Sequence, residues 1–210
     1  LNCELDSIFT SDIREMIAKK PTVDIEHIAK EKSVLFITSS PVNPSLHQFI
    51  GAFYSCLFKT LFEFAEECPD GKLPIPVHVL CDDFATGCRV NQFEDLISIF
   101  REKQISATIL VQSESQLETM YGSDATTTII NNSDTYVYVG GNDLRTARNI
   151  SERLNVPLDE VLYMPVGQAI IFRRGQKPIA FRHRYDILHD KRYQKITKQY
   201  EKMIVSDDDR

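Results

Sequence analysis

Short apolar runs alternate with longer amphipathic stretches along most of this chain. Four runs are rich in β-branched and aromatic residues, namely 33–38, 77–81, 106–111 and 135–139. Apolar residues recur at helical spacing in the stretches that follow them, namely 46–68, 93–100, 117–130 and 143–154. Because alternating strands and helices imply right-handed crossovers between parallel strands, we expect an α/β domain with three layers, in which helices cover both faces of a mostly parallel sheet.

The pattern changes toward the C-terminal part of the sequence. Two apolar runs, 168–172 and 178–181, flank the turn sequence 174–177, which predicts a closing β-hairpin at the sheet edge. Four apolar residues then share one stripe at helical spacing, namely Tyr193, Ile196, Tyr200 and Met203. The sequence therefore predicts an amphipathic helix after the hairpin, followed by an acidic tail over 206–210.

Composition is that of a soluble globular domain. The 210 residues are 42% hydrophobic and 26% charged, and no stretch has the roughly eighteen consecutive apolar residues that a membrane-spanning helix needs. The five cysteines form no pair of CxxC motifs, so we expect reduced thiols in a cytosolic compartment. We interpret the first residue, Leu1, as the start of a fragment of a longer protein.

Charge is distributed unevenly along the sequence. The formal net charge of -6 argues against a nonspecific nucleic-acid coat protein, yet residues 173–202 contain ten Lys or Arg against three acids. This basic segment could contact a phosphate backbone. Its alternation with apolar residues also fits the solvated face of a docked helix, so both interpretations stay open.

Polar residues follow the ends of the predicted strands. Asp82–Asp83 comes directly after the second run, Gln112 after the third and Asn142–Asp143 after the fourth. Ligands of open parallel sheets bind beyond these strand ends, where loops meet the N–H groups of helix N-termini. Two acids at a strand end are typical of a Walker B motif, in which the first carboxylate holds Mg²⁺ through water and the second orients the attacking water. The alternative is that Asp82–Asp83 only caps a turn or the following helix.

Gln112 and Arg101 extend this hypothesis. A glutamine at a strand end beside a Walker B motif can sense the γ-phosphate and position water; its structural alternative is a cap for the helix at Glu114. Arg101, in the helix after the second strand, could serve a neighbouring subunit as an arginine finger that stabilises transition-state charge. Spacing alone favours a simpler role for Arg101, a surface ion pair with Glu102 or Asp95.

Residues 77–151 resemble the TraG/TraD-type coupling proteins of type IV secretion. The resemblance is carried by VHVLCDDFATG, QFEDLISIFREKQIS, TILVQSESQLETMYG, TIINNSDTYVYVGGND and TARNIS, in matching order and spacing. Upstream, VDIEHIAKEKSVLFITSSP and GAFYSCLFKTLFEFAEE resemble the stretch that precedes the Walker B motif in Gram-positive members. The likeness weakens only toward the two ends of the sequence.

This resemblance implies part of a RecA-like P-loop NTPase fold. Residues 1–20 would be the tail of an upstream helical domain, and 21–205 the C-terminal, Walker B half of the ATPase domain. The implied protein is a hexameric, DNA-translocating ATPase of conjugation, anchored in the bacterial inner membrane with this part in the cytoplasm. It would use ATP and Mg to bring relaxase-bound single-stranded DNA to the secretion channel and its ATPases.

The resemblance also assigns roles to four residues. The family's Walker B pair falls on Asp82 and Asp83, its sensor glutamine on Gln112 and its candidate arginine finger on Arg101. Asp82 and Gln112 would then contact the nucleotide, and Asp82 would hold Mg²⁺ through water.

Two features depart from the family pattern. The family usually has Asp-Glu at the Walker B motif, so the shorter Asp83 predicts slower or lost hydrolysis. No GxxxxGK[ST] phosphate loop occurs in these 210 residues, and the family places that loop upstream of its helical domain. We therefore expect an ATPase only in the complete protein, and little nucleotide binding by this fragment alone. The alternative function is a non-hydrolysing docking module that recognises relaxosome or secretion-substrate proteins.

Overall fold

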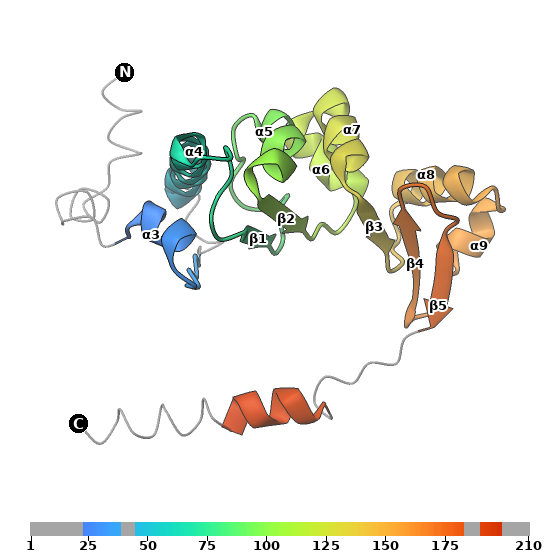
Figure 1. Cartoon of the computed structure of the whole chain (residues 1–210). Coiled ribbons are helices and arrows are strands. Elements are labelled where there is room, and N and C mark those ends of the chain that lie inside the picture. The colour runs from blue at the N-terminus through green and yellow to red at the C-terminus, as the bar shows by residue number, and fades with distance from the viewer. Residues whose placement is uncertain (1–22, 39–44, 183–189, 199–210) are drawn as a thin grey trace.

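Two short sheets, both lined by helices, make up the centre of the molecule (Figure 1). The computed structural model describes residues 23–38, 45–182 and 190–198. Strands β1 (Val77–Cys81) and β2 (Ile105–Ile109) pair in parallel, and Val77 lies opposite Ile105. Strands β3 (Thr135–Tyr138), β4 (Gln168–Arg173) and β5 (Ile179–Arg182) form an antiparallel sheet in that order.

The helices follow the predicted periodicity closely. In chain order they are α3 (Ile25–Lys30), α4 (Ser45–Glu67), α5 (Phe93–Ile99) with the 3-10 turn η1 (Phe100–Lys103), α6 (Glu114–Tyr121), α7 (Ser123–Asn132), α8 (Leu144–Leu154) and α9 (Leu158–Leu162), and residues 191–198 form a further helix. The stretch 117–130, expected as one helix, is divided at Gly122, whose φ of 87° ends α6 before α7 begins. Glycine reaches that conformation without a steric cost.

Aromatic side chains dominate the core under the parallel sheet. The ring of Phe58 on α4 lies 4.9 Å from that of Phe100, and Phe84 lies 4.7 Å from Phe93. Tyr121 at the end of α6 stacks on Phe84 with ring centroids 5.5 Å apart. Because these side chains come from five different helices, turns or loops, their packing fixes α4, α5 and α6 against one face of β1 and β2.

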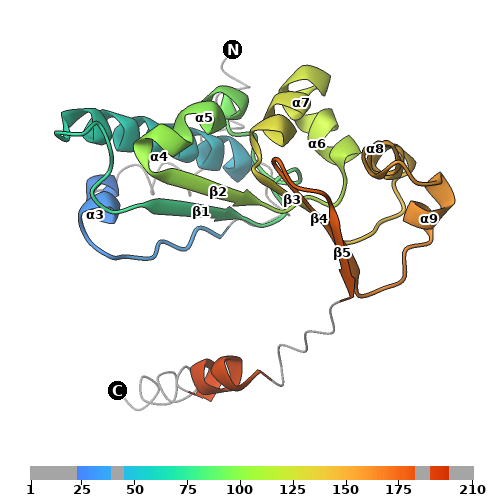
Figure 2. The ribbon, with the colours of Figure 1, turned by 45° about the vertical axis from the view of Figure 1, so that its right-hand side comes forward.

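The opposite face of the parallel sheet is open in the described part of the chain. Leu80 is 65% exposed there, and the His78 ring bonds to the hydroxyl oxygens of Ser106 at 2.7 Å and Thr108 at 3.2 Å. Figure 2 shows α4 and α5 on the other side of β1 and β2. Of the three layers that the sequence predicts, the described residues therefore show the sheet and one helical layer.

A second core joins the antiparallel sheet to α8 and α9. Tyr138, Ile150, Val161 and Phe172 are buried in it. Inward and outward residues alternate along β3, with Tyr136 and Tyr138 facing the helices and Val137 exposed. The predicted closing hairpin is confirmed, since β4 and β5 pair around the turn 174–177.

Two predictions about strands are wrong. Residues 33–38 form no strand, and their side chains are exposed, Val34 by 78% and Phe36 by 87%. A fully apolar strand needs sheet neighbours and a layer on each face, and the described part offers this segment neither. The run 135–139 is a strand, but it pairs antiparallel with β4 instead of joining the parallel sheet. The reason is the connection: α9 follows α8 and turns the chain back before β4.

The predictions for 1–20 and for the acidic tail 206–210 concern residues outside the described ones. Among the described helices, none combines the length and the apolar character needed to cross a bilayer.

Candidate functional site

Asp82 and Asp83 form a turn directly after β1, and both are exposed. Oδ1 of Asp82 accepts a hydrogen bond from the Asp83 amide at 3.1 Å, and the Asp83 carbonyl accepts one from the Thr86 amide at 2.9 Å. Asp82 therefore has the turn-capping role that the sequence left open. It uses one carboxylate oxygen of Asp82 and leaves Oδ2 for a ligand.

The backbone of Asp83 adopts a left-handed conformation with φ of 47°. Few residues tolerate this region, and Asp and Asn are among them because their short polar side chains hydrogen-bond locally. The conformation fixes the direction in which Asp83 leaves the strand end. It also gives a physical reason why the shorter acid suits this position better than glutamate does.

Gln112 lies at the same edge of the parallel sheet as the two acids. The Leu110 amide donates to the Cys81 carbonyl at 2.9 Å, and the Phe84 amide donates to the Leu110 carbonyl at 2.9 Å. These two bonds join the end of β1 to the residues just before Gln112. The structure thus brings Asp82, Asp83 and Gln112 to one edge, as the parallel pairing of β1 and β2 requires.

The side chain of Gln112 is exposed and does not cap the following helix. That cap is Ser113, whose hydroxyl oxygen accepts from the Gln116 amide at 3.1 Å. The Gln112 amide donates to Oε1 of Gln116 at 3.4 Å. The helix-capping role that the sequence left open for Gln112 therefore belongs to Ser113.

Arg101 lies at the other end of the sheet. It is an exposed residue of η1, close to Gln104, whose carbonyl accepts from the Val77 amide at the start of β1. Five residues of strand, roughly 15 Å, separate that end from Asp82. Arg101 cannot reach the Asp82 edge of its own chain, so an arginine finger here would have to act on a neighbouring subunit.

Asp143, the fourth polar strand-end position, has a structural role. It is the N-cap of α8, and its Oδ2 accepts from the Thr146 amide at 2.8 Å, the Thr146 hydroxyl at 2.6 Å and the Ser115 hydroxyl at 2.8 Å. These hydrogen bonds, the one from the Thr146 hydroxyl foremost, lower the pKa of Asp143. The Asp143 carboxylate is therefore engaged by the start of its own helix and by Ser115 of α6.

Sequence reasoning missed a buried polar bridge between α6 and α8. Glu114 is only 7% exposed, its amide donates to the Thr146 hydroxyl at 3.0 Å, and its Oε2 accepts from Nδ2 of Asn149 at 2.5 Å. Burial, followed by the charge of the Glu114 carboxylate, raises the pKa of Tyr136. The only available signal was the helix-start sequence Ser113-Glu114-Ser115-Gln116, which indicates a cap without indicating its partner.

The donor set at the strand edge is small. In the described part of the chain, no group of three or more His, Cys, Asp or Glu side chains is arranged to hold a metal ion. The donors at this edge are the carboxylates of Asp82 and Asp83 and the side-chain amide of Gln112. They would suffice for only part of a nucleotide site. A hollow of about 270 Å³ lies nearby, lined by His47, Gly51, Ala52, Gly87, Cys88, Arg89 and Asn91, and it contains none of these three residues.

Comparisons with known proteins agree with the resemblance. Residues 76–155 match the family described as the TraM recognition site of TraD and TraG. A search of curated proteins gave no match. The solved structure of the bacterial conjugative coupling protein TrwBdeltaN70, unbound, shares 18% identity with a TM-score of 0.56, covering 66% of this chain and 37% of that one.

A second structure, the plasmid coupling protein TrwB in complex with ADP and Mg²⁺, gives the same TM-score and identity over 68% of this chain and 38% of that one. At this identity the likeness concerns the fold. The chain spans less than two fifths of the length of these coupling proteins. Residues 76–155 therefore match the segment described as the TraM recognition site of TraD and TraG, and the chain shares the fold of a conjugative coupling protein over about two thirds of its length.

Proposed function

We propose that the protein to which this chain belongs is the coupling ATPase of a conjugative type IV secretion system. One observation carries the proposal: Asp82, Asp83 and Gln112 stand at the carboxyl edge of the parallel pair β1 and β2, the edge where open α/β sheets bind their ligands. The nucleotide-bound structures of TrwB support it, because they place ADP and Mg²⁺ in a protein of this fold.

We assign a different role in ATP hydrolysis to each of Asp82, Asp83 and Gln112. Asp82, whose Oδ1 stabilises the turn, would offer Oδ2 to a water bound to Mg²⁺. Asp83 would orient the attacking water, and Gln112 would contact the terminal phosphate. ATP and Mg would supply the transferable phosphoryl group and the charge that stabilises it, held mainly by parts of the protein other than the described residues.

The proposed assembly follows from the same residues. Because Arg101 cannot reach the Asp82 edge of its own chain, its use as an arginine finger requires a ring of subunits, which we propose to be a hexamer. The ring would face the cytoplasm, anchored to the inner membrane by other parts of the protein, and would pass relaxase-bound single-stranded DNA toward the channel. The family description supports contact with a relaxosome protein through residues 76–155.

ATP turnover by the complete protein tests the proposal. Asp82→Asn keeps an acceptor for the Asp83 amide and removes the charge, so turnover should fall by about 100-fold or more while the fold is kept. Asp95→Asn is the matched control, since it removes an exposed acid from α5, away from the strand edge. Unchanged turnover in Asp82→Asn would exclude the assigned role.

A docking module without hydrolysis is the second candidate. The short second acid favours it, because Asp83 in its left-handed conformation has less reach toward a water than glutamate would have. This function predicts no measurable turnover by the complete protein, together with binding of a relaxosome protein that is indifferent to Asp82→Asn. Turnover that disappears in Asp82→Asn would rule it out.

A further inference from the structure

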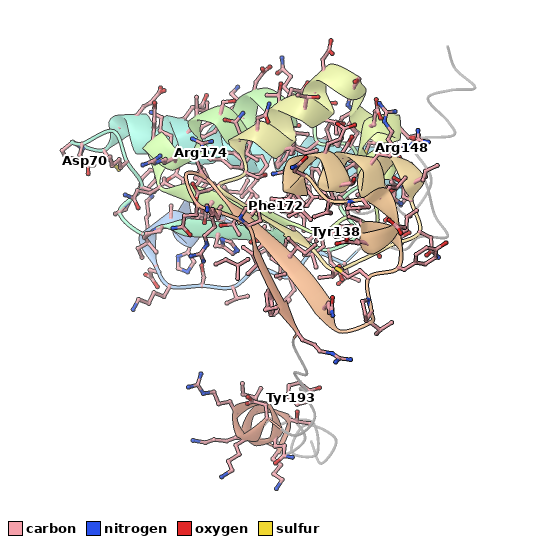
Figure 3. All side chains as sticks on the ribbon, turned by 90° about the vertical axis from the view of Figure 1, so that its right-hand side faces the viewer. Asp70, Tyr138, Arg148, Phe172, Arg174 and Tyr193 are labelled. Carbon is pink, nitrogen blue, oxygen red and sulfur yellow. The ribbon has the colours of Figure 1, made fainter. Side chains whose placement is uncertain are left out.

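Two separate apolar cores hold the described part of the chain together. One lies under β1 and β2 and includes residues of α6, and the other packs β3 and β4 against α8 and α9. Figure 3 shows Tyr138 and Phe172 of the second core on the strands that α8 covers. Where α6 meets α8, polar groups join the two cores through hydrogen bonds and an ion pair between Arg145 and Glu118. A polar junction of this kind can shift without opening either apolar core.

The first turns of α6 and α8 are bonded to each other. The Glu114 amide is one of the N–H groups that a helix start leaves without an intrahelical partner, and it donates to the Thr146 hydroxyl at 3.0 Å. The Ser115 hydroxyl donates to Oδ2 of Asp143 at 2.8 Å. The Thr146 hydroxyl donates in turn to the same oxygen of Asp143 at 2.6 Å. Thr146 therefore closes a ring of hydrogen bonds between the two helix starts.

The side chain of Glu114 adds a second contact between the same helices. Its Oε2 accepts from Nδ2 of Asn149, one turn after Thr146, at 2.5 Å. Glu114 is 7% exposed and Thr146 is 5% exposed, so water has little access to this junction. A buried polar group that loses its partner is costly, and the first turn of α6 therefore follows α8 when α8 moves.

Gln112 lies two residues before Glu114, and its own contacts hold it weakly. Its side chain is exposed, and its backbone amide lies 3.4 Å from Oε1 of Gln116, which is long for an N–H···O bond. On one side Gln112 is held by the bond from the Leu110 amide to β1, and on the other side by the first turn of α6. A shift of that turn therefore moves Gln112 relative to Asp82, which follows β1.

We propose that Thr146 is a positioning residue, which sets the place of Gln112 at the strand edge through the first turn of α6, and that α8 thereby regulates hydrolysis at this site. The role rests on the function proposed above, because Gln112 belongs to the same site. A movement of the second core would pass through α8 to Gln112. The movement needed is small, since a misplacement of about 1 Å can cost about 100-fold in rate.

ATP turnover by the complete protein tests the proposal. Thr146→Val removes the hydroxyl and keeps the shape of the side chain. It should lower kcat at least about 10-fold with little change in the KM for ATP, because other parts of the protein would hold most of the nucleotide. Thr146→Ser keeps the hydroxyl and should stay within about 2-fold of the parent. Thr127→Val is the matched control, since the Thr127 hydroxyl donates to the Ser123 carbonyl of its own helix, α7.

A double-mutant cycle with Gln112→Ala separates positioning from a general structural role. If Thr146 acts through Gln112, Thr146→Val should lower kcat no further in the Gln112→Ala background. Two losses that add in full would overturn the proposal, and so would unchanged kcat in Thr146→Val while Asp82→Asn abolishes turnover. Parent turnover that is absent, or indifferent to Asp82→Asn, would refute the proposed function itself, and the role of Thr146 with it.

Amide hydrogen exchange of the 210-residue chain gives a measurement that does not depend on activity. The Thr146 hydroxyl protects the Glu114 amide, so Thr146→Val should raise the exchange rate of this amide at least about 10-fold, and Thr146→Ser should not. The amides of β1 show whether the fold is kept, and their exchange should not change. Ser115→Ala removes the other bond between the helix starts and is the milder variant if Thr146→Val does not fold; it should raise the same exchange rate about 3-fold. Unchanged exchange at Glu114 in both variants would overturn the proposal.

Discussion

The backbone amide of Phe84 donates a hydrogen bond of 2.9 Å to the carbonyl of Leu110. Through this bond the turn that holds Asp82 and Asp83 is tied to the segment that leads to Gln112. The backbone positions from which Asp82, Asp83 and Gln112 extend are therefore held together, although all three residues are exposed. A site that binds phosphate needs groups held in place before the ligand arrives. Mutation of Asp83 tests how much the conformation of this turn contributes to stability.

Asp83→Glu should destabilise the chain by about 1 kcal/mol, because the left-handed backbone at φ 47° tolerates Asp and Asn better than longer side chains. Asp83→Asn should be close to neutral for the same reason. Urea unfolding measures both. Asp95→Glu is the matched control, since it makes the same chemical change at an exposed acid of α5, where φ is not positive. Equal losses at the two positions would show that the turn conformation has no part in the effect.

The common edge at which Asp82, Asp83 and Gln112 lie was predictable from the sequence, and the direction in which 135–139 pairs was not. An apolar run that ends in Asp82–Asp83 reveals both the strand and its exposed end, because burial of the run leaves the acids at the edge. For 135–139 the same kind of pattern says nothing about whether the neighbour is parallel. That depends on α9, a helix of five residues that reverses the chain. The buried partners of Glu114 also escaped prediction, because contacts between residues 35 apart leave no local periodicity.

Gly51→Ala should lower stability although it replaces a glycine within a helix. In α4, alanine would normally stabilise by about 1 kcal/mol. At Gly51, however, the added Cβ would lie 2.6 Å from the Arg89 carbonyl oxygen, so backbone would have to move. Gly87→Ala is the control, because its Cβ would meet nothing within 4 Å. Thermal unfolding compares the two, and a Gly51→Ala chain more stable than the parent would contradict the close approach.

Stability should fall at acidic pH through Asp143. The pKa of this N-cap is lowered by its bonds from Thr146, so its contribution is fully present above the ordinary value of about 4 and is lost as pH falls through the folded value. Asn accepts the same cap bonds and does not titrate. The difference in unfolding free energy between the parent and Asp143→Asn should therefore shrink or reverse from pH 6 to pH 3, by no more than about 1 kcal/mol. A difference that is constant with pH would contradict this account.

The side chain of Arg153 connects α8 to the antiparallel sheet through two aromatic rings. Its guanidinium carbon lies 4.9 Å from the centroid of Tyr136 and 4.3 Å from that of Phe172, and the two rings are themselves packed edge to face at 5.9 Å. Because Arg153 is exposed, we expect the cation–π contacts to contribute about 1 kcal/mol, the upper end of the range for exposed sites. Arg153→Met keeps most of the apolar stem and removes the cation, so it should lower the free energy of unfolding by that amount, and Arg153→Lys should lower it less. Urea unfolding measures the loss against Arg148→Met, the same change at an exposed arginine of the same helix. A loss no greater than that of Arg148→Met would mean that the rings hold α8 by apolar packing alone.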